Sequence, residues 1–184
     1  MTTKFSYSDL KRIVEKIGSL SAIEGYEFKL YDLTVKLGVE DKTVVELGTL
    51  AGWSTRALLA AVNDSGGHLY SIDIERSCSV LFMDEPNWTF ICGDSVTVPQ
   101  TWSRKIDHLY IDTVHTFTHT LQELMLWYPF ITEKGIISMH DTEYDKDEFG
   151  VKRAIQEFLK THPELSFEND TTAPYGLGIL RRKT

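Results

Sequence analysis

The sequence has only two cysteines, Cys78 and Cys92, among its 184 residues. Two cysteines so differently placed do not make a disulfide framework, so we expect a reducing compartment. The sequence also lacks any run of about 18 apolar residues, the length that a membrane-spanning helix needs. Its first residues lack the basic, apolar and small-residue pattern of a signal peptide. These absences predict a soluble cytoplasmic protein that does not act at a membrane.

Positive charge is also scarce, with 19 Lys and Arg against 27 Asp and Glu and a formal net charge of −8. Because the acids are spread along the chain, we expect no basic stripe that would bind nucleic acid or an anionic membrane. There are no internal repeats, low-complexity tracts or convincing linkers. A chain of this length usually forms one domain. We therefore expect one domain over residues 1–184, with a helical cover at 1–40 and an α/β core at 41–184.

The stretch Thr43–Thr55 has the form of a buried strand, a glycine turn and the start of a helix. Its short apolar run is typical of a strand buried on both faces of a parallel sheet. Gly48 has no Cβ to keep a ligand away from the backbone, and Gly52 lets the chain turn so that Ser54 or Thr55 caps the helix. The stretch therefore predicts a cofactor cradle, with a purely structural joint as the alternative.

The cradle differs from the Gly-x-Gly-x-x-Gly pattern that holds a dinucleotide pyrophosphate, because the middle glycine is missing and Glu46 stands two residues before Gly48. A carboxylate near an ammonium or a sulfonium is favourable, whereas one near a pyrophosphate is not. The motif therefore favours S-adenosylmethionine over a nicotinamide dinucleotide.

Strands and helices alternate from Thr43 to Arg182, and the last two strands look like an antiparallel hairpin. This order predicts an α/β fold, a Rossmann-like, doubly wound and mostly parallel seven-stranded sheet with the C-terminal hairpin at its edge and two covering N-terminal helices. We expect helices near 9–18, 25–37, 56–62, 116–131 and 151–159, and strands near 43–47, 68–75, 88–92, 106–111, 135–139, 165–168 and 176–181. Glu133–Gly135 is the expected turn into the fifth strand, and the helix near 116–131 is expected to face inward with Leu121, Leu124, Met125 and Tyr128. Ligands of such sheets lie beyond the carboxyl ends of the strands.

Polar residues follow several of these strands. Asp73 ends the second strand, at about the distance of 20 residues from the glycine turn at which an acid accepts hydrogen bonds from ribose hydroxyls. After the third strand, Asp94 is expected to accept from an adenine amino group and Ser95 to supply a hydroxyl or a backbone donor. The structural alternatives are a helix cap for Asp73 and an Asx turn for Asp94.

Asp112 and Asp141 end neighbouring strands, so we expect their carboxylates to approach one point. Two such carboxylates repel each other, and a divalent ion such as Mg²⁺ removes the repulsion. A bound ion can also hold a substrate hydroxyl and lower its pKa. The alternative is that Asp112 only caps the next helix and Asp141 only bonds backbone at a turn.

Two histidines lie beside these acids and are candidates for the base that removes a hydroxyl proton, because imidazole titrates near neutral pH. His115 lies three residues after Asp112, and His140 directly precedes Asp141. We prefer His115 as the base, with His140 as the second choice or as a metal ligand. A purely structural hydrogen-bonding role is the alternative for each histidine.

Six segments of the chain carry a combined pattern. They are Glu24-Gly25, Val45–Thr55, Tyr70–Asp73, Gly93–Ser95, Ile106–His115 and Gly135–Thr142. Together they resemble class I S-adenosylmethionine-dependent methyltransferases. Within that class they are most similar to small O-methyltransferases that modify sugars, macrolides and other natural products, and more distantly similar to catechol O-methyltransferases.

The resemblance implies roles for several residues. Glu46, Gly48 and Ser54 would contact the methionine end of the cofactor, Asp73 the ribose, and Asp94 with Ser95 the adenine; Gly52 and Asp112 complete the expected cofactor-binding set. Asp112 and Asp141 match metal positions of the catechol group. Two positions depart from that group, because Thr142 stands where it has an asparagine ligand and His115 where it has a catalytic lysine.

We therefore predict an enzyme that transfers the methyl group of S-adenosylmethionine to a hydroxyl of a small molecule or sugar, with Mg²⁺ as a possible helper. Two other functions stay open. One is a regulatory or scaffold protein that binds the cofactor without turnover, and the other is a nicotinamide oxidoreductase. The sequence does not identify the acceptor or the oligomeric state, and a homodimer stays open.

Overall fold

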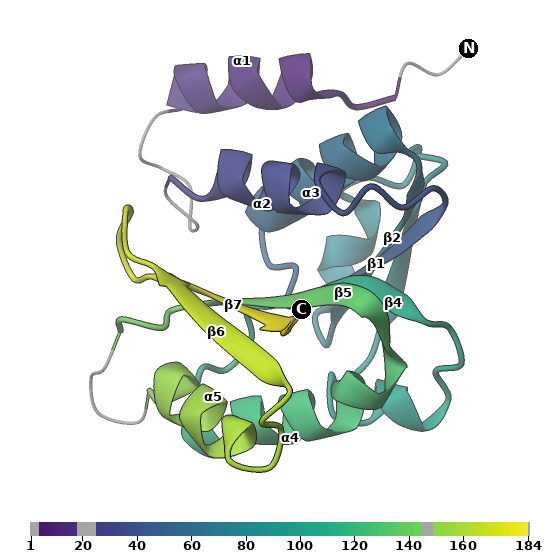
Figure 1. Cartoon of the computed structure of the whole chain (residues 1–184). Coiled ribbons are helices and arrows are strands. Elements are labelled where there is room, and N and C mark those ends of the chain that lie inside the picture. The colour runs from purple at the N-terminus through teal and green to yellow at the C-terminus, as the bar shows by residue number, and fades with distance from the viewer. Residues whose placement is uncertain (1–3, 18–24, 145–148, 184) are drawn as a thin grey trace.

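The computed structural model describes residues 4–17, 25–144 and 149–183. Its strands are β1 (Lys42–Leu47), β2 (Gly67–Asp73), β3 (Trp88–Cys92), β4 (Ile106–Ile111), β5 (Ile131–His140), β6 (Leu165–Asp170) and β7 (Leu177–Arg182). They form one seven-stranded sheet in the order β3-β2-β1-β4-β5-β7-β6 (Figure 1). The first five strands are parallel, and β7 pairs antiparallel with both β5 and β6. This arrangement confirms the predicted Rossmann-like fold with its C-terminal hairpin.

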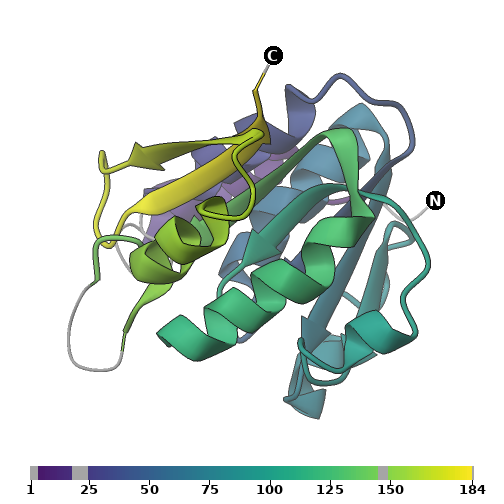
Figure 2. The same ribbon diagram turned by 60° about the horizontal axis from the view of Figure 1, so that its bottom comes forward.

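Helices cover both faces of the sheet. They are α1 (Tyr7–Ile17), α2 (Glu27–Val35) and α3 (Trp53–Ser65) on one face, and α4 (Phe117–Trp127) and α5 (Val151–Leu159) on the other (Figures 1 and 2). Short 3-10 turns among the described residues connect elements; they are η2 (Arg76–Val80), η3 (Val98–Gln100) and η4 (Tyr128–Phe130). In the part of the chain that the structure describes, none of the helices has the length and apolar character needed to cross a bilayer.

The two layers of helices pack against opposite sides of the same strands. Val44 of β1 belongs to a core with Leu58 of α3, whereas its neighbour Val45 packs in a second core with Leu124 of α4. Each such side chain is fully buried, which stabilises the fold by roughly 1.5–3 kcal/mol. A strand buried on both faces in this way has the continuous apolar run seen in the sequence.

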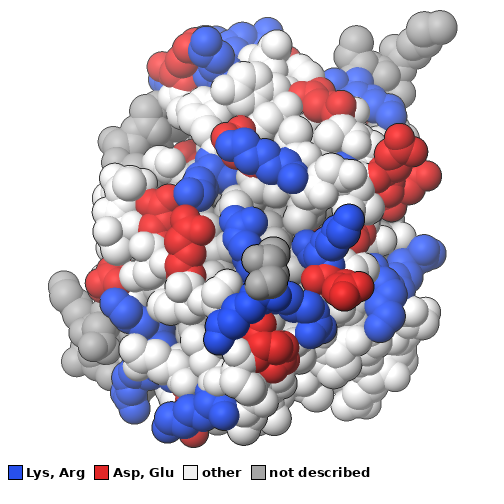
Figure 3. All heavy atoms as spheres, in the orientation of Figure 1, with Lys and Arg blue, Asp and Glu red and all other residues white. Residues whose placement is uncertain are grey.

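Both charge signs mix on the surface shown in Figure 3. Lys and Arg gather near the C-terminus on this face, with Asp and Glu between and around them. No stripe of one sign crosses this view of the molecule.

Several predicted boundaries are wrong. The helix predicted over 25–37 is shorter because Gly25 has a φ of 87° and lies outside α2. The turn predicted at Glu133–Gly135 lies inside β5, where a Cβ on Gly135 would overlap the backbone of Ile106 on β4. This glycine therefore permits a close strand approach at a shift of register and does not make a turn. Gly18 and Glu24 lie outside the described residues.

The inward face of α4 also differs from the prediction. Met125, which was expected in the core, is 56% exposed, and the buried positions are Thr120, Glu123, Leu124 and Trp127. The helix ends at Trp127, and the chain continues as a 3-10 turn that contains a proline. Because the buried face of α4 differs from the expected one, a carboxylate, Glu123, lies inside the protein.

A buried histidine ties α2 to the sheet. His108 of β4 lies with Nδ1 2.7 Å from Thr34 Oγ1 and with Nε2 2.7 Å from Ser138 Oγ. Burial lowers the pKa of His108 to about 3, so the ring is neutral in the folded protein at neutral pH. The unfolded chain, in contrast, protonates this ring near pH 6.5.

His108 should therefore make the fold sensitive to mild acid. The unfolded state binds the extra proton between the two pKa values, so stability falls as the pH drops below about 6.5, by about 2 kcal/mol between pH 6.5 and pH 5. The difference in the free energy of unfolding between wild type and His108→Gln, measured by urea denaturation, should shrink by this amount from pH 6.5 to pH 5. His162→Gln, at a partly exposed histidine, is the control. An equal difference at both pH values would contradict the assignment.

Candidate active site

A cavity of about 580 Å³ opens beyond the carboxyl ends of β1 to β5. Asp73 of β2, Asp94 after β3, Asp112 after β4 and His140 of β5 line it, together with the glycine turn after β1. This volume is typical of a small-molecule site. Among the described residues, none from α1 or α2 lines the cavity. These two helices instead pack over α3 and one face of the sheet.

Most residues predicted for the site lie on the wall of this cavity. They are Gly48, Ser54, Asp73, Asp94, Ser95, Asp112, His115, His140 and Asp141. Glu46 and Gly52 lie behind the wall. Gly52 precedes α3 with a φ of 72°, and a Cβ there would press on the ring of Phe82.

Glu46 is fully buried and holds the start of α3 against β1. Its carboxylate accepts hydrogen bonds from Ser54 Oγ at 2.6 Å, Thr55 Oγ1 at 2.8 Å and Ser71 Oγ at 2.5 Å. Burial raises the pKa of Glu46 to about 7, although these hydroxyls favour the charged form. Neither Ser54 nor Thr55 caps α3 as predicted, because both hydroxyls turn to Glu46 and Gly52 occupies the cap position.

Gly48 is needed for a contact within the protein. It has a φ of 89°, and a Cβ on it would overlap the carbonyl of Asp112. The two turns are drawn together because Asp112 N donates to Leu47 O at 2.8 Å. The missing Cβ of Gly48 therefore lets the turns after β1 and β4 meet. The sequence interpretation had explained this missing Cβ by the approach of a ligand.

Gly48→Ala should destabilise the protein much more than Gly38→Ala. Both glycines have positive φ, which penalises alanine by roughly 1–2 kcal/mol. Only Gly48 adds an overlap with backbone, whereas the space around Gly38 is open. We expect Gly48→Ala to lower the free energy of unfolding by about 3 kcal/mol or more, measured by chemical denaturation. Equal losses in the two variants would refute the role given to Gly48.

Asp73 fixes the glycine turn. Its Oδ2 accepts from Thr49 N at 2.8 Å and from Leu50 N at 3.0 Å, and its Oδ1 accepts from Glu75 N at 2.8 Å. The carboxylate also lines the cavity, and each of its oxygens can accept more than one hydrogen bond. Asp73 thus combines a structural contact with an acceptor that faces a ligand.

At the end of β3, Asp94 forms the Asx turn considered above, with Oδ1 accepting from Val96 N at 3.0 Å. Ser95 is 7% exposed, and its hydroxyl donates to Glu123 Oε1 at 2.6 Å. The sequence interpretation missed Glu123. The available signal was its spacing of four residues from both His119 and Trp127, which puts all three on one face of α4.

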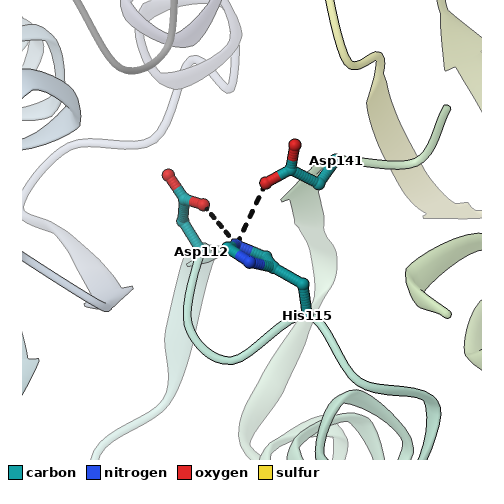
Figure 4. A group of neighbouring side chains, drawn as sticks. All are labelled: Asp112, His115 and Asp141. Atoms are coloured by element: carbon teal, nitrogen blue, oxygen red, sulfur yellow. Dashed lines mark hydrogen bonds and ion pairs between the residues drawn. The ribbon is translucent and has the colours of Figure 1, made fainter. Parts of the chain in front are cut away.

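Asp112, His115 and Asp141 point toward one another (Figure 4). His115 Nε2 lies 2.9 Å from Asp112 Oδ1 and 3.1 Å from Asp141 Oδ2. His140 Nδ1 lies 3.3 Å from Asp141 Oδ2 and 3.7 Å from Asp112 Oδ1. Tyr110 donates its hydroxyl to Asp112 Oδ2 at 2.9 Å. The structure therefore brings both predicted acids and both predicted histidines together.

The two acids and the two histidines of this cluster stabilise one another's charged forms. Burial opposes ionisation of Asp112, but the hydrogen bond from His115 and the nearby positive charge of His140 hold the pKa of Asp112 below its usual value. Burial likewise opposes the protonated form of His140, yet Asp112 and Asp141 raise the pKa of His140 to about 9. The pKa of His115 is also raised, because Asp112 outweighs its burial.

Two residues of this cluster have left-handed backbone. The φ of His115 is 61° and that of Asp141 is 59°, which is costly for side chains other than glycine. Gly150 N donates to His115 O at 2.8 Å, and the Phe149 ring stacks on His115 with 5.6 Å between ring centres. These contacts hold His115 in its strained position.

The cluster also suits a divalent ion. One ligand atom each from Asp112, His115 and Asp141 lies within 4.8 Å of the others. Thr142, at the third metal position of the catechol group, is 2% exposed and donates its hydroxyl to Asn169 at 2.6 Å. The available donors are therefore two carboxylates and an imidazole, a set that accepts Mn²⁺ or Zn²⁺ as well as Mg²⁺.

A comparison with protein families finds a match to the methyltransferase domain over residues 45–142, which is more than half of the chain. The chain belongs to this methyltransferase family. The match spans the glycine turn, the ends of β1 to β5 and the four-residue cluster. It confirms the prediction of a class I S-adenosylmethionine-dependent methyltransferase and favours it over a nicotinamide oxidoreductase.

Solved structures share the fold of this methyltransferase at low sequence identity. An O-methyltransferase from Bacillus cereus in complex with SAH has a TM-score of 0.73 at 15% identity, over 96% of this chain and 91% of that one. The O-methyltransferase TomG from Streptomyces achromogenes, in complex with SAM and involved in tomaymycin synthesis, has a TM-score of 0.73 at 12% identity, over 96% and 89%. Comparison with curated protein sequences finds no match.

Proposed function

We propose that this methyltransferase transfers a methyl group from S-adenosylmethionine to a hydroxyl oxygen of a small molecule. One observation carries the proposal. A single cavity is lined by the candidate nucleoside contacts Asp73 and Ser95 and by a cluster in which His115 lies between two carboxylates. Such a cluster is suited to remove a proton from a hydroxyl before the oxygen attacks the methyl group. A neutral amine acceptor needs no such deprotonation before it attacks.

His115 is better placed than His140 to be the base. The side chain of His115 is 21% exposed on the cavity wall, whereas that of His140 is 3% exposed. Asp112 and Asp141 accept from His115 Nε2, which fixes the orientation of the ring, and they stabilise the imidazolium that forms when the other ring nitrogen, Nδ1, takes the hydroxyl proton. When bound, the cofactor supplies its sulfonium methyl group, so that an oxygen–carbon bond forms while the sulfur–carbon bond breaks and S-adenosylhomocysteine leaves.

A divalent ion fits beside this base. Asp112 and Asp141 would hold it, and it would supply a positive charge that lowers the pKa of the acceptor hydroxyl. Calorimetric titration with Mg²⁺ and Mn²⁺ tests this step. Binding that disappears in Asp141→Asn supports the site, and absence of binding by wild type contradicts it. If binding also disappears in His115→Gly, His115 is a ligand and His140 becomes the candidate base.

The test of the function has two stages. Binding of S-adenosylhomocysteine is first measured by calorimetry, and transfer of a labelled methyl group is then followed with a panel of hydroxylated acceptors and their amine counterparts. Formation of a methyl ether supports the proposal. Methylation of the amines alone contradicts the oxygen acceptor, and binding without any transfer supports the regulatory alternative.

A further inference from the structure

A buried carboxylate stands behind the wall of the cavity at the end of β3. Glu123 of α4 has no exposed surface, yet Ser95, Thr113 and His119, which all bond to it, line the cavity. Burying a carboxylate is unfavourable unless its oxygens are hydrogen-bonded. Glu123 therefore depends on these three side chains, and it fixes their orientation in return.

The directions of these hydrogen bonds follow from the number of available hydrogens. Ser95 Oγ donates its only hydrogen to Glu123 Oε1 at 2.6 Å, and Thr113 Oγ1 donates to Oε1 at 2.9 Å and to Oε2 at 3.0 Å. His119 Nε2 lies 3.1 Å from Ser95 Oγ and 3.2 Å from Glu123 Oε1. Because the serine hydrogen is already committed, His119 must be the donor in this contact.

The consequence is a wall that can accept hydrogen bonds at its hydroxyls but not donate them. The hydrogens of Ser95 and Thr113 both point to Glu123, so only their oxygen lone pairs remain for a ligand. The carboxylate of Asp94, which lines the same end of the cavity, is also an acceptor. A ligand edge that fits here carries N–H or O–H groups.

We propose that Glu123 is a positioning residue that makes this end of the cavity selective for a purine with an exocyclic amino group over a 6-oxo purine. The inference rests on the proposed function, because it takes the nucleoside end of the cofactor to lie here. A glutamine at 123 would fill the same space but carry an amide NH₂ group, which would allow one hydroxyl hydrogen to turn toward the ligand. The carboxylate is thus the feature that sets the preference.

Calorimetry with S-adenosylhomocysteine and S-inosylhomocysteine tests this role. Wild type should prefer the adenosyl ligand by at least about 30-fold, because a carbonyl oxygen would face buried acceptors. In Glu123→Gln the ratio of the two affinities should fall by about tenfold or more. Glu157→Gln on α5, where the side chain is 46% exposed, is the matched control and should keep the wild-type ratio.

A second variant guards against misfolding of the first. Thr113→Val keeps the shape of the side chain but removes one acceptor, and the ratio should fall about threefold. Wild type that binds both ligands equally, or folded variants that weaken both ligands by the same factor, would overturn the selectivity while cofactor binding stands. Wild type that binds neither ligand would instead overturn the proposed function itself.

Discussion

Replacing His115 with glycine is expected to lower the rate of methyl transfer by about 10²–10⁴-fold, the usual contribution of a general base. Glycine is the suitable replacement because the φ of His115 is 61°, which alanine would adopt only with strain. The affinity for S-adenosylhomocysteine should stay within about threefold of wild type, since His115 is assigned to the acceptor and not to the nucleoside. Initial rates at saturating cofactor and a calorimetric titration measure the two quantities.

Added imidazole distinguishes a base from a structural residue. His115→Gly leaves a space beside Asp112 and Asp141 in which imidazole can be held by the same carboxylates. Partial recovery of the rate with imidazole is therefore expected in this variant and not in wild type. A variant that keeps its full rate, or that loses cofactor affinity in proportion to rate, would contradict the assignment and direct attention to His140.

Asp73→Ala is expected to weaken binding of S-adenosylhomocysteine by about 100-fold, because it removes a charged acceptor from the ribose hydroxyls. The same variant also releases the backbone of Thr49 and Leu50, so part of the loss comes from the glycine turn. A 2′-deoxy analogue of the ligand separates the two effects. Removal of the hydroxyl should weaken binding to wild type by about tenfold and should have little further effect on Asp73→Ala.

The four affinities form a thermodynamic cycle between one protein group and one ligand group. Non-additive losses indicate direct contact between Asp73 and the ribose. Additive losses would show that Asp73 acts only by holding the turn, and the ribose contact would then be wrong. Circular dichroism of each variant checks that the sheet is intact.

The strands were the most predictable elements. The ranges expected for β3 and β4 agree with the structure, because both are short runs of mostly apolar and aromatic residues with turn residues at their ends. The turn expected at Glu133–Gly135 was wrong because pairing with β4 extends β5 through a glycine. Local sequence preference cannot reveal such a partner, which lies far away in the chain.

The positions of site residues at strand ends were predictable from the sequence. The hydrogen-bond partners of individual side chains were less predictable. Parallel strands end at one edge, so Asp112 and Asp141 could be brought together from the order of elements alone. The roles of Ser54 and Thr142 could not be derived in this way. Their hydroxyls bond to Glu46 and Asn169, choices that depend on packing between elements.

Glu123 shows the same limit. An acid within a helix is usually on the exposed face, and the periodic pattern of α4 allowed Met125 to be placed inside instead. The structure turns the helix so that Met125 is exposed and Glu123 meets Ser95 and Thr113. The positions of these partners and of His119 make a buried carboxylate acceptable at this point.

A crystal structure of the protein with S-adenosylhomocysteine tests the central claim most directly. The account predicts that the ligand lies across the carboxyl ends of the strands, with its ribose hydroxyls on Asp73, its base beside Ser95 and its sulfur on the side of His115. A ligand that occupies another part of the molecule, or that lies in this cavity in the opposite direction, would contradict the account.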